Sequence, residues 1–327
     1  YDDLYKTGVL LNLTSKHLLF KNDIFSADII LGDNLRYNFN YFIDNGFSWS
    51  FGLKLRYNTF NENIKVISET INKINLDYED FTNQAYMQTV FSRKFAIGAG
   101  IEQKRVIAST ETINLYKGAI YDSANNKLYF DKSNYFNLFA YLKLDTYDKS
   151  YFPKEGLFLD AGMLYYATSS DFTDTFSPFS QLKANFGIAT TVFNKLTFQF
   201  ISEAGLTLGE NENRALTFNV GGYGENFINN FIPFFGYDFA ELEGNGFLKS
   251  GLTLRYEFIK KNYFSLAGNY ARVDEDIFNE GRIFENTMSG YMVGYGLETF
   301  LGPVEVHHTW SPDHKENYWY FNVGFWF

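Results

Sequence analysis

The chain has 327 residues and a formal net charge of −10, which argues against a nucleic-acid-binding protein, because such a protein needs a basic surface to neutralise phosphates. It contains no cysteine, which excludes disulfides and thiolate metal sites. The sequence has no run of about 18 apolar residues, so it predicts no transmembrane helix. The sequence opens without a basic-then-apolar signal peptide, as expected of a mature or trimmed product.

Segments of about ten residues with alternating apolar and polar side chains recur along the whole chain. In the segment 47–58, Trp49 and Leu53 are among the apolar residues of one face, while Lys54 and Arg56 are among the polar residues of the other. Ten residues suffice to cross a bilayer as a tilted β-strand, with one face toward lipid. The pattern predicts sixteen strands, at 5–14, 15–21, 23–32, 35–44, 47–60, 83–93, 95–108, 135–146, 156–169, 181–193, 195–208, 247–259, 263–273, 288–300, 303–311 and 317–327.

The connections between these strands alternate in length. Tight turns, such as those at 44–46 and 301–303, alternate with long polar loops near 61–82, 109–134, 170–180, 209–246 and 274–287. Short turns on one side and long loops on the other are typical of outer-membrane barrels. We therefore predict an all-β fold, a 16-stranded antiparallel transmembrane β-barrel, forming one domain over residues 1–327 with its first and last strands paired.

A large soluble all-β protein, such as a stack of sandwiches or a propeller, is the structural alternative. Such a protein would hide its apolar strand faces in a core, and an aromatic content of 20% would require a very large one. No repeat of the length of a propeller blade is visible. The sequence therefore favours the membrane barrel.

Three stretches resemble the bacterial surface antigen barrels, the superfamily of outer-membrane insertases and translocators built around the Bam insertase. The stretch YFPKEGLFLDAG (151–162) is similar to the family's fP-x-x-G turn, and 221–258 resembles its long sixth extracellular loop with the strand that follows. The aromatic end, YWYFNVGFWF, resembles the recognition signal of outer-membrane barrels, with Gly324, Phe325 and Phe327 in the expected places. The resemblance covers the whole chain.

The tip of the long loop departs from the insertase pattern. Insertases of this family usually carry an Arg-Gly-aromatic tip, whereas the matching residues here are Phe235, Gly236 and Tyr237, without the arginine. The run PFFGY (233–237) and the ending GFWF look closer to barrels that follow a patatin-like phospholipase domain. A patatin hydrolase needs a serine nucleophile in a G-x-S-x-G elbow, and residues 1–327 contain none. The resemblance thus implies a lipase upstream of this chain, and no catalytic site within it.

Three functions stay open at this stage. The favoured one is an outer-membrane anchor and translocation domain of a patatin-linked surface antigen protein. A Bam-like insertase or protein secretion pore is the alternative, and the residues upstream of Tyr1 would discriminate the two. A passive porin ranks last, because a porin has no reason to carry the long Gly- and Tyr-rich loop at 209–246.

The length of this loop predicts a site inside the barrel, since an ordinary hairpin tip is much shorter. We expect the tip to fold inward and narrow the pore, against a wall that carries Arg255 and Glu257; ordinary polar lining explains these two residues equally well. Gly294 and Gly296, with Gly290, share the inward face of their strand, and a glycine row lets another backbone approach closely. Barrel curvature alone would also explain that row.

Other polar groups predict no cofactor and no metal site. His307 and His308 are neighbours on a strand, so their rings face opposite sides and cannot close on one ion. The acidic segments 68–80 and 273–281 offer carboxylates to a divalent cation, but runs of this kind are more often solvated, and we expect that here. The expected location is the bacterial cell outer membrane. The expected partners are outer-membrane lipids and lipopolysaccharide, the barrel assembly machinery during insertion, and either an outer-membrane protein complex or a second copy in a homodimer, with no nucleic acid.

Overall fold

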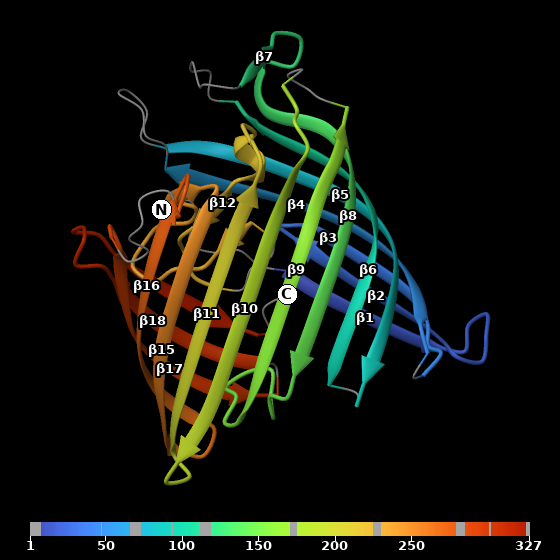
Figure 1. Cartoon of the computed structure of the whole chain (residues 1–327). Helices are drawn as coiled ribbons and strands as arrows, with labels where there is room; N and C mark the ends of the chain where they lie inside the picture. The colour runs from blue at the N-terminus through green and yellow to red at the C-terminus, as the bar shows by residue number, and fades with distance from the viewer. Residues whose placement is uncertain are drawn as a thin grey trace. The chain divides into compact units, whose positions relative to one another are not determined.

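A computed structural model describes residues 8–46, 48–65, 73–92, 94–111, 119–170, 175–224, 230–278, 285–300 and 302–324 (Figure 1). The chain divides into two compact units. The first unit comprises Tyr1–Leu142, Gly162–Gln181 and Thr207–Leu216, and the second comprises Lys143–Ala161, Leu182–Leu206 and Thr217–Phe327.

Strands make up nearly all of the regular structure in the described residues. Sixteen of them belong to one sheet, whose hydrogen-bonded order is β1-β2-β3-β4-β5-β6-β8-β9-β10-β11-β15-β16-β17-β18-β19, with the short β7 paired to β8. The predicted all-β fold with sixteen antiparallel strands is confirmed. In the part of the chain that the structure covers, no helix is long and apolar enough to cross a membrane.

The first unit contains the N-terminal strands, and their burial shows which way the apolar faces point. In β4, Leu53 and Leu55 are 59% and 45% exposed, whereas Ser50 and Gly52 on the other face are buried. A soluble sandwich would bury the leucines instead, so this pattern is that of a lipid-facing wall. The strands of this unit's N-terminal segment, Tyr1–Leu142, are β1 (Gly8–Lys16), β2 (Asp23–Gly32), β3 (Arg36–Ile43), β4 (Ser50–Lys65), β5 (Lys73–Phe91), β6 (Phe95–Thr110), β7 (Ile120–Asp122) and most of β8 (Lys127–Asp145).

One predicted strand, 15–21, is wrong. Strand β1 ends at Lys16, and a turn follows in which the Asp23 carboxylate accepts hydrogen bonds from the backbone N–H groups of Leu18 (2.7 Å), Leu19 (2.7 Å) and Phe20 (2.8 Å). Three donors converging on one carboxylate hold the backbone in a turn that the apolar run 18–20 does not reveal. The sixteenth strand is instead β7.

Two predicted loops, 61–82 and 109–134, are partly strand. Strand β5 begins at Lys73 and β8 at Lys127, which lengthens both well beyond their predicted starts. Polar side chains bond across the extended β4–β5 hairpin, where Asn61 donates to Asn75 at 2.7 Å. Alternation of apolar residues fades there, but the backbone ladder and the polar cross-strand pairs continue the sheet.

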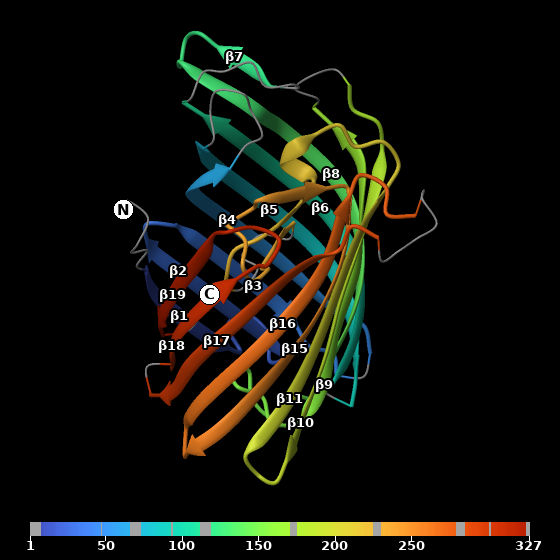
Figure 2. The ribbon, with the colours of Figure 1, turned by 90° about the vertical axis from the view of Figure 1, so that its left-hand side faces the viewer.

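The second unit contains the C-terminal strands and a small sheet formed by the long loop. Strands β15 to β18 run side by side in Figure 2, in agreement with their antiparallel pairing. In this unit the 209–246 loop forms a separate three-stranded sheet, while its 3₁₀ turn, Arg214–Leu216, belongs to the first unit. The remaining strands of the chain are β9 (Gly156–Ser169), β10 (Phe179–Val192), β11 (Leu196–Leu208), β12 (Phe218–Val220), β13 (Phe231–Ile232), β14 (Leu242–Gly244), β15 (Gly246–Ile259), β16 (Asn262–Asp274), β17 (Met288–Thr299), β18 (Gly302–Trp310) and β19 (Asn317–Val323).

Candidate functional site on the inner face of strands β15 to β19

The two faces of β15 differ sharply in burial. Leu252, Tyr256 and Phe258 are exposed on one face, as expected of a lipid-facing surface, while Arg255 on the other face is only 7% exposed. A buried arginine requires partners, because an isolated buried charge is costly. We call the side that carries Arg255 the inner face and ask what covers it.

The long loop covers one part of the inner face with a hydrophobic core of its own. Phe218 and Val220 from β12, Ile232 from β13, and the loop residues Phe234 and Tyr237 pack together with Phe247 of β15 and Ala271 of β16. Each of these side chains is less than 5% exposed. The described part of the loop therefore folds as a packed layer on β15 and β16.

The loop tip reaches β16, β17 and the end of β18. The Asn269 side-chain amide, oriented to satisfy both of its hydrogen bonds, accepts from Phe235 N and donates to Gly290 O, each at 2.9 Å. A side chain on Gly290 would overlap the Phe235 carbonyl, and one on Gly236 would lie 2.5 Å from the Trp310 carbonyl. The tip fits because these two positions have no side chain.

Tyr237 fastens the tip to the loop between β18 and β19. Its hydroxyl donates to the Asp313 carboxylate at 3.0 Å, and the same carboxylate oxygen accepts from the Ser289 backbone N–H at 2.7 Å. Burial, together with the neighbouring Asp313, raises the pKa of Tyr237 to about 12, which keeps the hydroxyl a donor at neutral pH. Burial acts to raise the pKa of Asp313, but its hydrogen bonds prevail and hold it below the ordinary value.

A second loop residue, Tyr223, extends the contact toward the C-terminus. Its ring stacks on Phe235 and Tyr320 and meets the edge of His307, with centroid distances of 6.1, 5.0 and 4.8 Å. The His307 ring lies over Gly294, where a β-carbon would collide with it. His308 packs on Trp310 and Trp319. The described residues contain no group of three or more potential metal ligands.

Arg255 is held by the connection between β8 and β9. Its guanidinium donates to the Pro153 carbonyl at 3.1 Å and to the Gln199 side chain at 2.7 Å. It also lies over the Phe152 ring, 5.2 Å from the centroid, a cation–π geometry. Phe152 in turn stacks on Tyr263 at 4.7 Å and occupies the space above Gly296.

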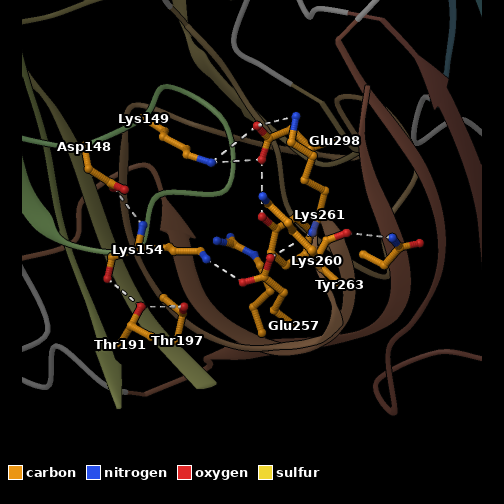
Figure 3. A network of polar contacts seen from close by, with 12 residues as sticks. Asp148, Lys149, Lys154, Thr191, Thr197, Glu257, Lys260, Lys261, Tyr263 and Glu298 are labelled. Atoms are coloured by element: carbon orange, nitrogen blue, oxygen red, sulfur yellow. Dashed lines mark hydrogen bonds and ion pairs between the residues drawn. The ribbon is translucent and has the colours of Figure 1, made fainter. Parts of the chain in front are cut away.

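Two ion pairs join the same connection to the inner face (Figure 3). Lys154 pairs with Glu257, and Lys149 pairs with Glu298 at 3.0 Å. Tyr263 donates to Glu298 from the neighbouring strand at 3.3 Å. The structure thus brings Arg255 and Glu257 to residues 153 and 154, and brings the loop tip to β16–β18 and Asp313.

The glycines of β17 form the common floor of these contacts. Along the strand, Gly290 underlies the loop tip, Gly294 underlies His307, and Gly296 underlies Phe152. The six residue steps from Gly290 to Gly296 span about 20 Å at the rise of a β-strand. Two segments from different parts of the chain therefore occupy the two ends of one glycine-lined strip.

Sequence reasoning missed the segment around Phe152 as a functional element. Its YFPKEG motif was recognised only as a turn, and nothing local shows that Lys149 and Lys154 reach residues more than 100 positions away. A usable signal existed: this connection is longer than the tight turns and combines an aromatic residue and a proline with two lysines. Of the C-terminal signal residues, only Gly324 is described, and its N–H donates to Pro303 O at 2.8 Å; Phe325 and Phe327 lie outside the described residues.

Comparison with known proteins places this arrangement in a family. A model of the OMP85 superfamily matches residues 1–327. The structures similar to the chain include BamA from Haemophilus ducreyi lacking POTRA domains 1–3, with a TM-score of 0.68, 12% identity and coverage of 95% of this chain and 66% of that one. CdiB from Acinetobacter baumannii has a TM-score of 0.61 and 13% identity, covering 97% and 56%. CdiB from Escherichia coli has a TM-score of 0.53 and 10% identity, covering 95% and 58%.

The chain therefore spans less than two thirds of the length of each of these structures. At such identities the likeness concerns the fold. A comparison with curated protein sequences found no match.

Proposed function

Because the chain belongs to the OMP85 superfamily, as an outer-membrane β-barrel protein of a bacterium, we propose that it is the anchor and translocation domain of a longer protein whose upstream part is a patatin-like lipid hydrolase. In this proposal residues 1–327 form one barrel domain, with β1 and β19 paired. Outer-membrane lipids and lipopolysaccharide surround it, the barrel assembly machinery inserts it, and an outer-membrane complex or a homodimer is its assembled form.

The observation that carries the proposal is the chemistry of the loop tip. Insertases of this superfamily usually place an arginine there, as the sequence resemblance indicates, and this chain has Phe235 instead. The tip rests on aromatic packing, backbone hydrogen bonds and the Tyr237–Asp313 bond. A tip held in this way supports an anchor whose inner loop is fixed more than it supports an insertase with a charged latch.

The upstream sequence provides the test. We expect a G-x-S-x-G elbow before Tyr1, and we expect the purified full-length protein to release fatty acid from phospholipid vesicles. Replacing the elbow serine by alanine should abolish release while leaving the heat-modifiable mobility of the barrel unchanged. Repeated periplasmic domains without an elbow would contradict the proposal.

A Bam-like insertase or protein secretion pore is the second candidate, favoured by the likeness in fold to BamA and CdiB. It makes a different prediction in cells. Depleting the protein would lower the amounts of other folded outer-membrane barrels or of an exported protein, whereas loss of a lipase anchor would leave both unchanged.

The C-terminal residue provides a prediction about assembly. Deleting Phe327 should strongly reduce the amount of folded barrel in the outer membrane while synthesis continues, because the assembly machinery loses the strand end that it recognises. Burial of one lipid-facing phenylalanine is worth only about 1.5–3 kcal/mol, too little to unfold a sheet of this size. Heat-modifiable mobility of the membrane fraction measures the effect. Equal amounts of folded barrel with and without Phe327 would mean that the end is only lipid-facing wall.

A further inference from the structure

The connection between β8 and β9 does not behave like the other short turns. Residues 146–155 lie across the inner face of five strands. Thr191 of β10 donates to the Lys154 carbonyl at 2.7 Å. Arg255 of β15 donates both to the Pro153 carbonyl and to the side chain of Gln199 on β11. Tyr263 of β16 and Glu298 of β17 complete the contacts. We call residues 147–155 the strap.

The strap is internally rigid and has a defined base. The Asp148 carboxylate accepts hydrogen bonds from the N–H groups of Lys154 (2.8 Å) and Glu155 (3.2 Å), which close the segment on itself. At the base, Thr146 N donates to Leu157 O at 2.9 Å, and the Thr146 hydroxyl donates to the same carbonyl. The strap can therefore move as one piece about residues 146 and 157, without breaking its own hydrogen bonds.

One side chain fixes the seated position. Phe152 is 8% exposed and has a φ of 51°, a left-handed conformation that is unfavourable for an aromatic residue. A β-carbon on Gly296 would lie 2.9 Å from its ring. The slot under Arg255 and beside Tyr263 is thus shaped to this one ring, and seating the ring holds a strained backbone in place.

The two ion pairs flank the slot on the side open to water. Lys149 and Lys154 keep 39% and 32% of their side chains exposed, while their partners Glu298 and Glu257 keep 26% and 13%, so solvent and salt reach both pairs from the lysine side. Pairs of this kind are individually weak and are screened by ions. The strap is therefore held by one buried ring, by hydrogen bonds from Thr191 and Arg255 to its carbonyl groups, and by two ion pairs that salt screens.

We propose that the strap is a closing element of the inner face at the turn end of the strands, released when the Lys149–Glu298 and Lys154–Glu257 pairs break. Release withdraws Phe152 from its slot and exposes Arg255, Glu257 and Gly296 to the water and ions along the inner face. The loop tip stays seated at the other end of the strip, because its contacts involve Gly290, Asn269 and Asp313 and none of the strap's ion pairs. This proposal is independent of an upstream hydrolase.

Conductance of the full-length protein in planar bilayers tests it. The K149E/K154E variant should increase the open fraction about tenfold, because two attractive pairs become repulsive. In the quadruple variant K149E/K154E/E257K/E298K, the charges of both pairs are exchanged. This variant should return the open fraction to the wild-type value. The control is K143E. Lys143 forms an exposed ion pair with Asp160, with 2.9 Å between the ammonium nitrogen and the carboxylate oxygen, and neither residue belongs to the strap. This variant should behave as wild type.

Two further measurements separate opening from misfolding. Raising the salt from 0.1 to 1 M shortens the screening length from about 10 to about 3 Å and should open the wild type but not the already open variant. Gly296→Ala, which displaces the Phe152 ring, should also open the protein, whereas Gly162→Ala, whose β-carbon would meet only one backbone oxygen at 3.5 Å, should not. Heat-modifiable mobility confirms that each variant is folded. Equal conductance in all folded variants, or failure of the exchanged pairs to restore closure, would overturn the proposal.

Discussion

Replacing Gly236 by alanine should detach the loop tip and destabilise the second unit by about 2–6 kcal/mol. Gly236 has a φ of 79°, which an alanine adopts only with strain, and its β-carbon would lie 2.5 Å from both the carbonyl carbon and oxygen of Trp310. Backbone atoms of a paired strand cannot move aside as a flexible side chain can. The strain and the overlap each cost about 1–3 kcal/mol.

The measurement is urea unfolding of the barrel in lipid vesicles, followed by limited proteolysis at the long loop. Gly46→Ala is the matched control, because Gly46 has a φ of 67° but nothing lies within 4 Å of its added β-carbon. It carries the conformational cost without the overlap. We expect new cleavage within residues 230–240 only in the Gly236 variant. Equal stability of the two variants would show that the tip is not seated on Trp310.

Replacing Glu203 by glutamine should cost about 3–5 kcal/mol, the effect expected when one partner of a buried ion pair is removed. Glu203 of β11 pairs with Lys249 of β15, and both side chains are largely buried. Lys183 of β10 also interacts electrostatically with Glu203. Without the carboxylate on β11, Lys183 of β10 and Lys249 of β15 repel each other across that strand. This repulsion adds to the loss of the pair.

Urea unfolding measures this change as well, with Asp160→Asn as its control. Asp160 pairs with Lys143 at 2.9 Å but is about half exposed, so its loss should cost no more than about 1 kcal/mol. Converting both Glu203 and Lys249 to methionine should recover most of the stability, because no uncompensated charge then remains at that pair. A cost for Glu203→Gln as small as that for Asp160→Asn would mean that water fills this part of the inner face.

The strands were predictable because crossing a membrane constrains the polarity of the side chain at each position of a strand. Lipid demands an apolar side chain at every second position, so Leu53 and Leu55 alternate with polar residues over the whole crossing. The rule ends where the strand leaves the membrane. Strands β5 and β8 continue beyond that point through polar ladders such as Asn61–Asn75, and no alternation marks them.

The turn after β1 was missed for a related reason. Leu18, Leu19 and Phe20 are apolar and continue the hydrophobic content of the strand, while the group that ends it is Asp23, whose carboxylate collects three backbone N–H groups. A carboxylate that caps a turn is identical in sequence to one that lines a barrel. Only its position after folding separates the two roles.

The candidate site was predictable in its ingredients but not in its pairings. The glycine row of β17 and the inward position of Arg255 follow from strand periodicity, and a long loop needs something to pack against. Which segment meets which glycine depends on contacts between residues such as Lys154 and Glu257, which are 103 positions apart. Such pairings are set by the arrangement of the strands, so a local pattern does not contain them.

The proposal that this barrel anchors a lipid hydrolase is tested most directly by where the hydrolase activity is found. Cells should express either the full-length protein or a form that ends before Tyr1, and phospholipid deacylation should be measured in outer-membrane and soluble fractions. The account predicts activity almost entirely in the outer membrane for the full-length protein and in the soluble fraction for the shortened form. Absence of deacylation from both forms, together with a fall in other outer-membrane barrels when the full-length protein is depleted, would contradict it.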